Sequence, residues 1–201
     1  HAIEYVPQVI LFGEESFLEE VEITRAEFIR RLRTSPVLPK TAAPPPGEFV
    51  KAFTRQLEHA DTILCIHPST EVSGTVRSAM TARDESFPGA DIRILDTRTI
   101  GGNLASMVIQ AAEGVEEGLP ADEILGRLQA MIPRGRLYFL VPTLEYLYRG
   151  GRIGGASALV GSALQIKPIL QLLDGRVEAL ERVRTQQRAR ARLVELVREQ
   201  C

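Results

Sequence analysis

One segment joins an apolar run to a cluster of hydroxyl side chains and a glycine: Thr62-Ile63-Leu64-Cys65-Ile66-His67-Pro68-Ser69-Thr70-Glu71-Val72-Ser73-Gly74-Thr75. The apolar residues 62–67 predict a buried strand, and residues 74–84 predict a helix. Between them lies the segment from Ser69 to Thr75, which we call the 69–75 junction. The start of a helix offers unpaired N–H groups, the positive end of its dipole and a capping hydroxyl, and all three favour a bound anion. The sequence therefore predicts that the junction binds a carboxylate or a phosphate.

Helical and strand patterns alternate on both sides of this junction. Residues 47–58 predict a helix before it, and residues 91–95 predict a second strand after it. Strands separated by helices pair in parallel, and ligands of parallel sheets bind beyond the carboxyl ends of the strands, where the junction falls. The sequence predicts an N-terminal α/β domain with a parallel sheet.

The N-terminal residues predict a β-hairpin, a helix and a loop. Residues 4–12 and 16–23 are apolar, β-rich runs on either side of Gly13. A capping box at Thr24 predicts the start of a helix that ends near Thr34. Five prolines between positions 36 and 46 predict that residues 35–46 form a loop.

The second half of the chain has a different pattern. Two more helices are predicted over residues 102–116 and 121–131, before the Pro133-Arg134-Gly135 break. Three strands and a terminal helix then follow, and Asp174-Gly175 predicts a hairpin turn between the last two strands; these elements are expected over residues 137–141, 167–173, 176–182 and 185–199. We therefore expect two domains, residues 1–133 with a parallel sheet and residues 134–201 with antiparallel strands.

Composition is that of an ordinary globular protein. The 201 residues are 44% apolar and 25% charged, with a net charge of −2, so no general electrostatic attraction to nucleic acid or to an anionic bilayer is expected. Cys65 and Cys201 lie far apart, which argues against a disulfide framework or a metal cluster and favours a reducing cytoplasm. We expect a cytoplasmic protein without a cofactor or a stable membrane insertion.

Four separated segments carry a family resemblance. They are TAAPPPGEF at 41–49, IHPSTEVSGTVRSA at 66–79, TLEYLYRGGRI at 143–153 and IKPIL at 166–170. In this order they resemble the DegV family, bacterial proteins that bind a fatty acid and, in fatty acid kinase systems, present its carboxylate to a kinase subunit. The resemblance spans essentially the whole chain. It implies a two-domain α/β fold, a long-chain fatty acid buried near the domain interface, and a fatty acid kinase as partner.

The resemblance also implies which residues hold the ligand. Thr41 and Ser73 match the family's hydroxyl residues for the carboxylate, and Arg152 matches the arginine of its Gly-Gly-Arg turn. A guanidinium and two hydroxyls can offset part of the solvation that a buried carboxylate loses. Arg184 matches a basic segment through which the family meets the kinase, and no catalytic residue is implied. The nearby head-group loops are formed by Gly74, Thr75 and Gly151.

The chain departs from the family pattern at three places. Family members usually begin with a strand that leads to an Asp-Ser-Thr segment, and end with further strands and a loop with histidine and glycine. Neither piece is present, so we expect a missing first strand and an incomplete second domain. The usual Thr-Ser-Gln-Pro-Ser pattern is replaced by Thr41-Ala42-Ala43-Pro44-Pro45, which removes two hydroxyls and an amide from the head-group network.

The sequence also allows other functions for the chain and other roles for single residues. The chain could be an enzyme that binds a small phosphorylated or carboxylated metabolite at the 69–75 junction and the loop from Gly150 to Gly155, although it lacks a G-x-x-x-x-G-K-[ST] phosphate loop. It could also be an interaction module without lipid. Taken singly, Ser73 could be a helix N-cap, Arg152 a surface ion-pair residue, and His67 either a structural histidine or a general base.

Overall fold

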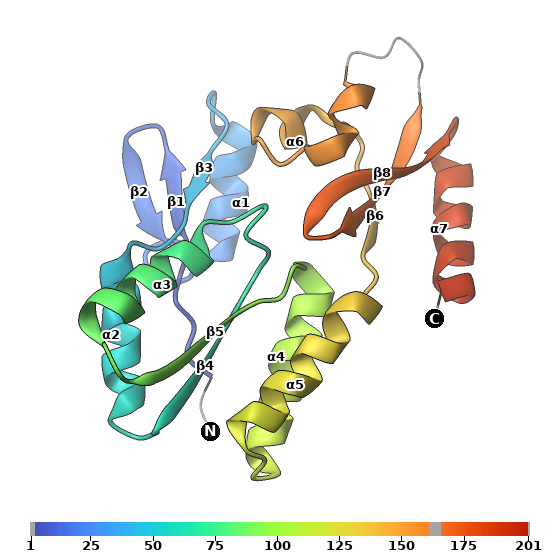
Figure 1. Ribbon diagram of the computed structural model, residues 1–201. Helices are drawn as coiled ribbons and strands as arrows, with labels where there is room; N and C mark the ends of the chain where they lie inside the picture. The colour runs from blue at the N-terminus through green and yellow to red at the C-terminus, as the bar shows by residue number, and fades with distance from the viewer. Residues whose placement is uncertain (1–2, 161–165, 201) are drawn as a thin grey trace.

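The computed structural model describes residues 3–160 and 166–200, so Cys201 lies outside the described residues. In this part the chain forms a mixed α/β fold with one parallel pair of strands and two antiparallel sheets (Figure 1). The strands are β1 (Val9–Phe12), β2 (Glu15–Leu18), β3 (Lys40–Ala42), β4 (Thr62–His67), β5 (Asp91–Asp96), β6 (Tyr138–Leu140), β7 (Lys167–Leu173) and β8 (Arg176–Val183). The α-helices are α1 (Arg25–Thr34), α2 (Pro46–Leu57), α3 (Thr75–Ser86), α4 (Gly101–Glu116), α5 (Ala121–Met131), α6 (Glu145–Arg149) and α7 (Gln186–Gln200).

The parallel pair β4–β5 is covered by helices on both faces. Its register runs from Thr62 opposite Asp91 to His67 opposite Asp96, as the βαβ pattern predicts. Ile63 and Ile92 pack against α2 and α3, whereas Leu95 packs against α4 and α5. Because successive side chains of a strand point to opposite faces, the apolar residues of each strand contribute to two hydrophobic cores, one on each face. The carboxyl ends of both strands, and the 69–75 junction, therefore lie at one edge of this layer.

The sheet β6-β7-β8 is antiparallel, as expected for the second half of the chain. Asp174 and Gly175 form the turn between β7 and β8 with φ of 49° and 82°, the left-handed values that a two-residue hairpin turn needs. One face of the sheet packs against α6 and the 3₁₀ helix η2 (Gly154–Leu159), and the other against α7. In Figure 1 the tip of this hairpin is directed at the N-terminal half of the molecule.

The N-terminal sheet has the order β2-β1-β3 and corrects two details of the sequence prediction. Within the segment 35–46, predicted as a loop, Lys40–Ala42 forms β3 and pairs with the free edge of β1. The prolines flank this short strand and leave its own N–H groups available for pairing. The first strand begins only at Val9, after Pro7, and the return strand ends at Leu18 in a turn.

The expected division at residue 133 stays a prediction. The 3₁₀ helix η1 (Ile132–Arg134) follows α5, and residues 135–137 connect it to β6. Within residues 3–160 and 166–200, no helix is long and apolar enough to cross a lipid bilayer.

His67 ends β4 as a buried side chain, 4% exposed. Its ring centroid lies 5.6 Å from that of Phe49, and its Nε2 lies 3.0 Å from Sγ of Cys65. Its carbonyl accepts a hydrogen bond from the Thr97 hydroxyl at 2.7 Å. Burial lowers the pKa of His67 from 6.5 to about 4, although the Asp96 carboxylate acts in the opposite direction. This setting favours a structural histidine that stays neutral over a general base.

We expect His67 to make stability depend on pH. Between pH 6.5 and 4 the unfolded chain takes up a proton at this residue and the folded chain does not, so the stabilisation is complete above pH 6.5 and is lost as the pH falls to 4. Each pH unit in this window is worth about 1.4 kcal/mol, or about 3 kcal/mol in all. Urea denaturation of the wild type and of His67→Gln between pH 7 and pH 4 measures this component as a difference between the two proteins.

The matched control is His59→Gln, because His59 is exposed. This variant should keep the wild-type pH dependence. Identical pH profiles for the wild type and His67→Gln would show that the buried imidazole does not couple folding to pH.

Candidate functional site

The 69–75 junction forms a compact turn after β4. Ser69 is fully buried, and its carbonyl accepts hydrogen bonds from the N–H groups of Val72 at 3.2 Å and Ser73 at 3.0 Å. Gly74, not Ser73, is the N-cap residue of α3. The Ser73 hydroxyl donates to Oγ1 of Thr75 at 3.3 Å and accepts from its N–H at 3.4 Å. Both bonds are long, so the half-buried Ser73 hydroxyl can turn to another acceptor.

Arg152 lies against this junction. Its Nε donates to the carbonyl of Val72 at 3.3 Å, and its Nη1 donates to the carbonyl of Gly150 at 2.6 Å. Within the described residues no carboxylate forms a salt bridge with Arg152, so only carbonyl groups hold the guanidinium. The structure therefore places an uncompensated positive charge at Val72, the residue before Ser73, from a segment 80 positions away. This is a suitable arrangement for an anion.

Two glycine-containing turns lie on either side of Ser73 and Arg152. After α6, the Gly151 N–H donates to the carbonyl of Tyr148 at 3.0 Å, and the Arg152 N–H donates to that of Leu147 at 2.9 Å. These bonds end the helix and direct Arg152 back toward the junction. On the other side, Thr75 is buried in the first turn of α3, whereas Gly74 is exposed.

The segment that contains Thr41 passes this region at Ala43, whereas Thr41 itself lies in β3. Thr41 is exposed and lies opposite Ile10. Two positions later, the side chain of Ala43 lies 3.5 Å from the point that a Cβ at Gly74 would occupy. The first motif thus passes directly beside the junction. In the described part of the chain, no hydrogen bond joins the Thr41 hydroxyl to Ser73 or Arg152.

The tip of the β7–β8 hairpin also contacts the junction, which the sequence did not predict. The Ser69 hydroxyl donates to the carbonyl of Gly175 at 2.9 Å. The guanidinium of Arg98, which follows β5, donates to the carbonyl of Asp174. These partners are 106 and 76 positions apart. No local pattern signals them, apart from the clustering of hydroxyls in the junction itself.

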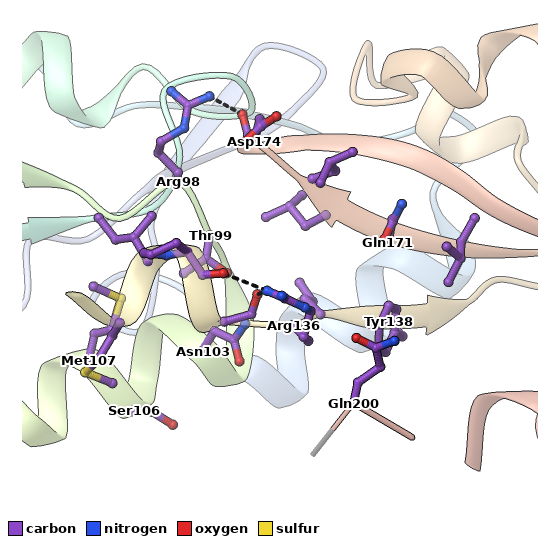
Figure 2. Close-up of a pocket in the computed structure, with 18 residues that line it drawn as sticks. Arg98, Thr99, Asn103, Ser106, Met107, Arg136, Tyr138, Gln171, Asp174 and Gln200 are labelled. Atoms are coloured by element: carbon purple, nitrogen blue, oxygen red, sulfur yellow. Dashed lines mark hydrogen bonds between the residues drawn. The ribbon is translucent and has the colours of Figure 1, made fainter. Parts of the chain in front are cut away.

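A cavity of about 530 Å³ lies between the α4–α5 pair and the sheet β6-β7-β8 (Figure 2). Figure 2 shows Arg98 and Asp174 at one side of it and Tyr138 and Gln171 at another. Apolar residues including Met107, Leu172 and Leu180 contribute to the lining. Thr41, Ser73 and Arg152 do not line it. The cavity nevertheless adjoins the junction, because the carbonyl of its lining residue Thr99 accepts a hydrogen bond from the Ser69 N–H at 2.9 Å.

Arg184 lies away from these groups, as an exposed residue between β8 and α7. No hydrogen bond or ion pair within residues 3–160 and 166–200 involves its side chain. By contrast, Arg192 on α7 is surrounded by three glutamates, and their hydrogen bonds raise its pKa. The partners of Arg192 are Glu181, Glu195 and Glu199.

The described residues around the site include no cluster of metal ligands. Across the described ranges, no group of three or more His, Cys, Asp and Glu side chains could hold a metal ion. Cys65 is a free thiol, and burial raises its pKa to about 12. The chemistry present is that of hydroxyl, backbone N–H and guanidinium donors.

Comparison with known proteins identifies the family of this chain. A sequence model described as "Uncharacterised protein, DegV family" matches residues 1–201. A DegV domain-containing protein of Deinococcus radiodurans is 40% identical over 193 residues, which cover 96% of this chain and 68% of that protein.

Two solved structures are similar in fold and in sequence. A fatty-acid-binding DegV family protein from Thermus thermophilus has a TM-score of 0.87 and 37% identity, over 97% of this chain and 69% of that one. A stearic acid-binding protein from Eubacterium ventriosum has a TM-score of 0.87 and 28% identity, over 97% of this chain and 68% of that one. The resemblance seen in the four motifs is thereby confirmed, and the chain belongs to the DegV family.

Proposed function

We propose that this chain binds a long-chain fatty acid and holds its carboxylate between Ser73 and Arg152, with Thr41 as a third donor. The observation that carries this proposal is the hydrogen bond from Nε of Arg152 to the carbonyl of Val72, which brings a guanidinium to the residue that precedes Ser73. The solved relatives from T. thermophilus and E. ventriosum support it, since both are described as fatty-acid-binding proteins. The reported relatives give no support to the alternative of a metabolite enzyme.

The donors match a carboxylate in number and charge. A carboxylate that leaves water needs charge-assisted hydrogen bonds, and a guanidinium with free N–H groups supplies them together with a hydroxyl. Arg152 uses Nε and Nη1 for carbonyls, and Nη2 donates to no other described residue. That nitrogen remains for the ligand. The polar site therefore fixes the orientation of the ligand and selects an acid.

The acyl chain supplies most of the affinity. Each buried methylene contributes about 0.8 kcal/mol, so a long chain gains on the order of 10 kcal/mol before its entropic costs. We assign the chain to the cavity between α4–α5 and the sheet β6-β7-β8. Its volume of about 530 Å³ falls within the range of small-molecule sites, and its wall is bonded to the junction through Thr99 and Ser69.

We also propose that the chain acts together with a partner protein. The chain presents the bound carboxylate to a fatty acid kinase subunit and is not catalytic alone. Arg184 is our candidate for the docking contact, because it is exposed and its charge is not compensated by a carboxylate in the described structure. An unpaired surface cation changes association with an acidic partner more than it changes folding.

Removing either head-group donor should weaken binding while sparing the fold. We expect Ser73→Ala and Arg152→Ala each to reduce the affinity for octadecanoate by roughly 1 to 3 kcal/mol, since each variant loses hydrogen bonds to a charged group. Isothermal titration calorimetry measures the loss. Ser78→Ala and Arg149→Ala are matched controls on α3 and α6 and should bind as the wild type does. If Ser73→Ala and Arg152→Ala bind octadecanoate with wild-type affinity, the head-group assignment is wrong.

A single tryptophan can report whether the cavity holds the acyl chain. The chain has no tryptophan, and Ser106 lines the cavity from α4 while remaining exposed. We expect octadecanoate to shift the emission of Ser106→Trp to shorter wavelength, because the ligand displaces water from the indole. Ile109→Trp, an exposed α4 position that does not line the cavity, is the control. If octadecanoate binds tightly but the emission of Ser106→Trp does not change, the acyl chain lies outside this cavity.

The docking contact can be separated from lipid binding. Arg184→Glu should retain octadecanoate with wild-type affinity and should lower its phosphorylation by a fatty acid kinase by about tenfold at low salt. Arg190→Glu reverses the charge of another exposed arginine, on α7, and serves as the control. Equal phosphorylation rates for the wild type and Arg184→Glu would remove Arg184 from the interface.

A further inference from the structure

The turn of the β7–β8 hairpin meets the N-terminal half of the chain through three consecutive residues. The carbonyls of Asp174 and Gly175 accept hydrogen bonds from Arg98 and Ser69, respectively. The side chain of Arg176 lies 3.5 Å from Glu71. The last contact is a surface ion pair between exposed side chains and contributes little. The buried bond from Ser69 to Gly175 is the one that fixes the approach of the hairpin.

The hairpin lies so close to the 69–75 junction that no space remains for a side chain at position 175. Gly175 is buried with φ of 82°, and a Cβ at this residue would lie 2.3 Å from Oγ of Ser69. A glycine is therefore needed both for the turn conformation and for the contact. Any other residue would push the hairpin and the junction apart.

The contact between Ser69 and Gly175 adjoins the segments that carry Ser73 and Arg152. On one side, Ser69 uses its carbonyl to accept the N–H of Ser73 at 3.0 Å. On the other side, the segment after Arg152 packs on β8, where a Cβ at Gly154 would lie 2.1 Å from the carbonyl of Val177. The hairpin thus touches the supports of Ser73 and of Arg152, which belong to different parts of the chain.

We propose that Ser69 and Gly175 are positioning residues of the carboxylate site: their contact sets the distance between the Ser73 hydroxyl and the Arg152 guanidinium. This inference rests on the proposed function and adds residues that do not touch the ligand. Two donors bind one carboxylate strongly only at the correct separation, whereas an acyl chain in an apolar cavity tolerates small shifts. Breaking the contact should therefore weaken the recognition of the head group selectively.

The test compares two ligands of equal length, hexadecanoate and hexadecan-1-ol, by displacement of a fluorescent fatty-acid analogue from the 201-residue chain. Ser69→Ala and Gly175→Ala should each bind hexadecanoate about tenfold more weakly, and should bind hexadecan-1-ol as the wild type does. Gly89→Ala is the control for backbone strain, because Gly89 has φ of 98° and a Cβ there meets nothing within 4 Å. Arg176→Ala controls for the surface ion pair.

A double-mutant cycle excludes a general loss of structure. If Ser69 acts through Arg152, Ser69→Ala should have a much smaller effect on hexadecanoate binding in an Arg152→Ala background than in the wild type. Equal losses for the acid and the alcohol, or unchanged affinity for the acid, would overturn the positioning role while leaving the proposed function intact. A wild-type chain that binds no hexadecanoate would overturn the proposed function, and this inference with it.

Discussion

The hydrogen bond from the Ser69 hydroxyl to the carbonyl of Gly175 is the contact on which the candidate site depends. It joins the carboxyl edge of the parallel strands to the tip of an antiparallel hairpin. Both partners are buried, so a loss of either would leave a polar group unsatisfied in the interior. Because Gly175 has no side chain, the two backbones approach closely, and the segments that carry Ser73 and Arg152 are held together.

Regular elements support these loops from both sides. The pair β4–β5 is packed on both faces and ends at the 69–75 junction, while the hairpin β7–β8 is packed between η2 and α7. Loops that are anchored on such elements can hold donors at fixed positions without occupying the core. The proposed head-group donors Ser73 and Arg152 lie on these loops, and the cavity that we assign to the acyl chain lies between α4–α5 and the sheet β6-β7-β8. In the proposed function, different parts of the fold supply the specificity for an acid and the affinity for an acyl chain.

Local sequence patterns are sufficient to predict most helices and strands, but they do not predict the contacts between them. The apolar periodicity of β4, the βαβ order and the Asp174-Gly175 turn were all readable from the sequence, because each depends on neighbouring residues. The strand β3 was missed, since its pairing with β1 is non-local and its flanking prolines suggest a loop. Ser73 and Arg152 came from a family resemblance, and the structure brings their segments together. The roles of Ser69 and Arg98 depend on partners 106 and 76 positions away, which no local pattern reveals.

A crystal structure of this chain with bound octadecanoate would show directly whether Ser73 and Arg152 hold the carboxylate. We expect electron density for a carboxylate within about 3 Å of both the Ser73 hydroxyl and the Arg152 guanidinium, and for an acyl chain that occupies the cavity between α4–α5 and the sheet β6-β7-β8. A carboxylate bound at another surface, with Ser73 and Arg152 contacting only protein or water, would contradict it.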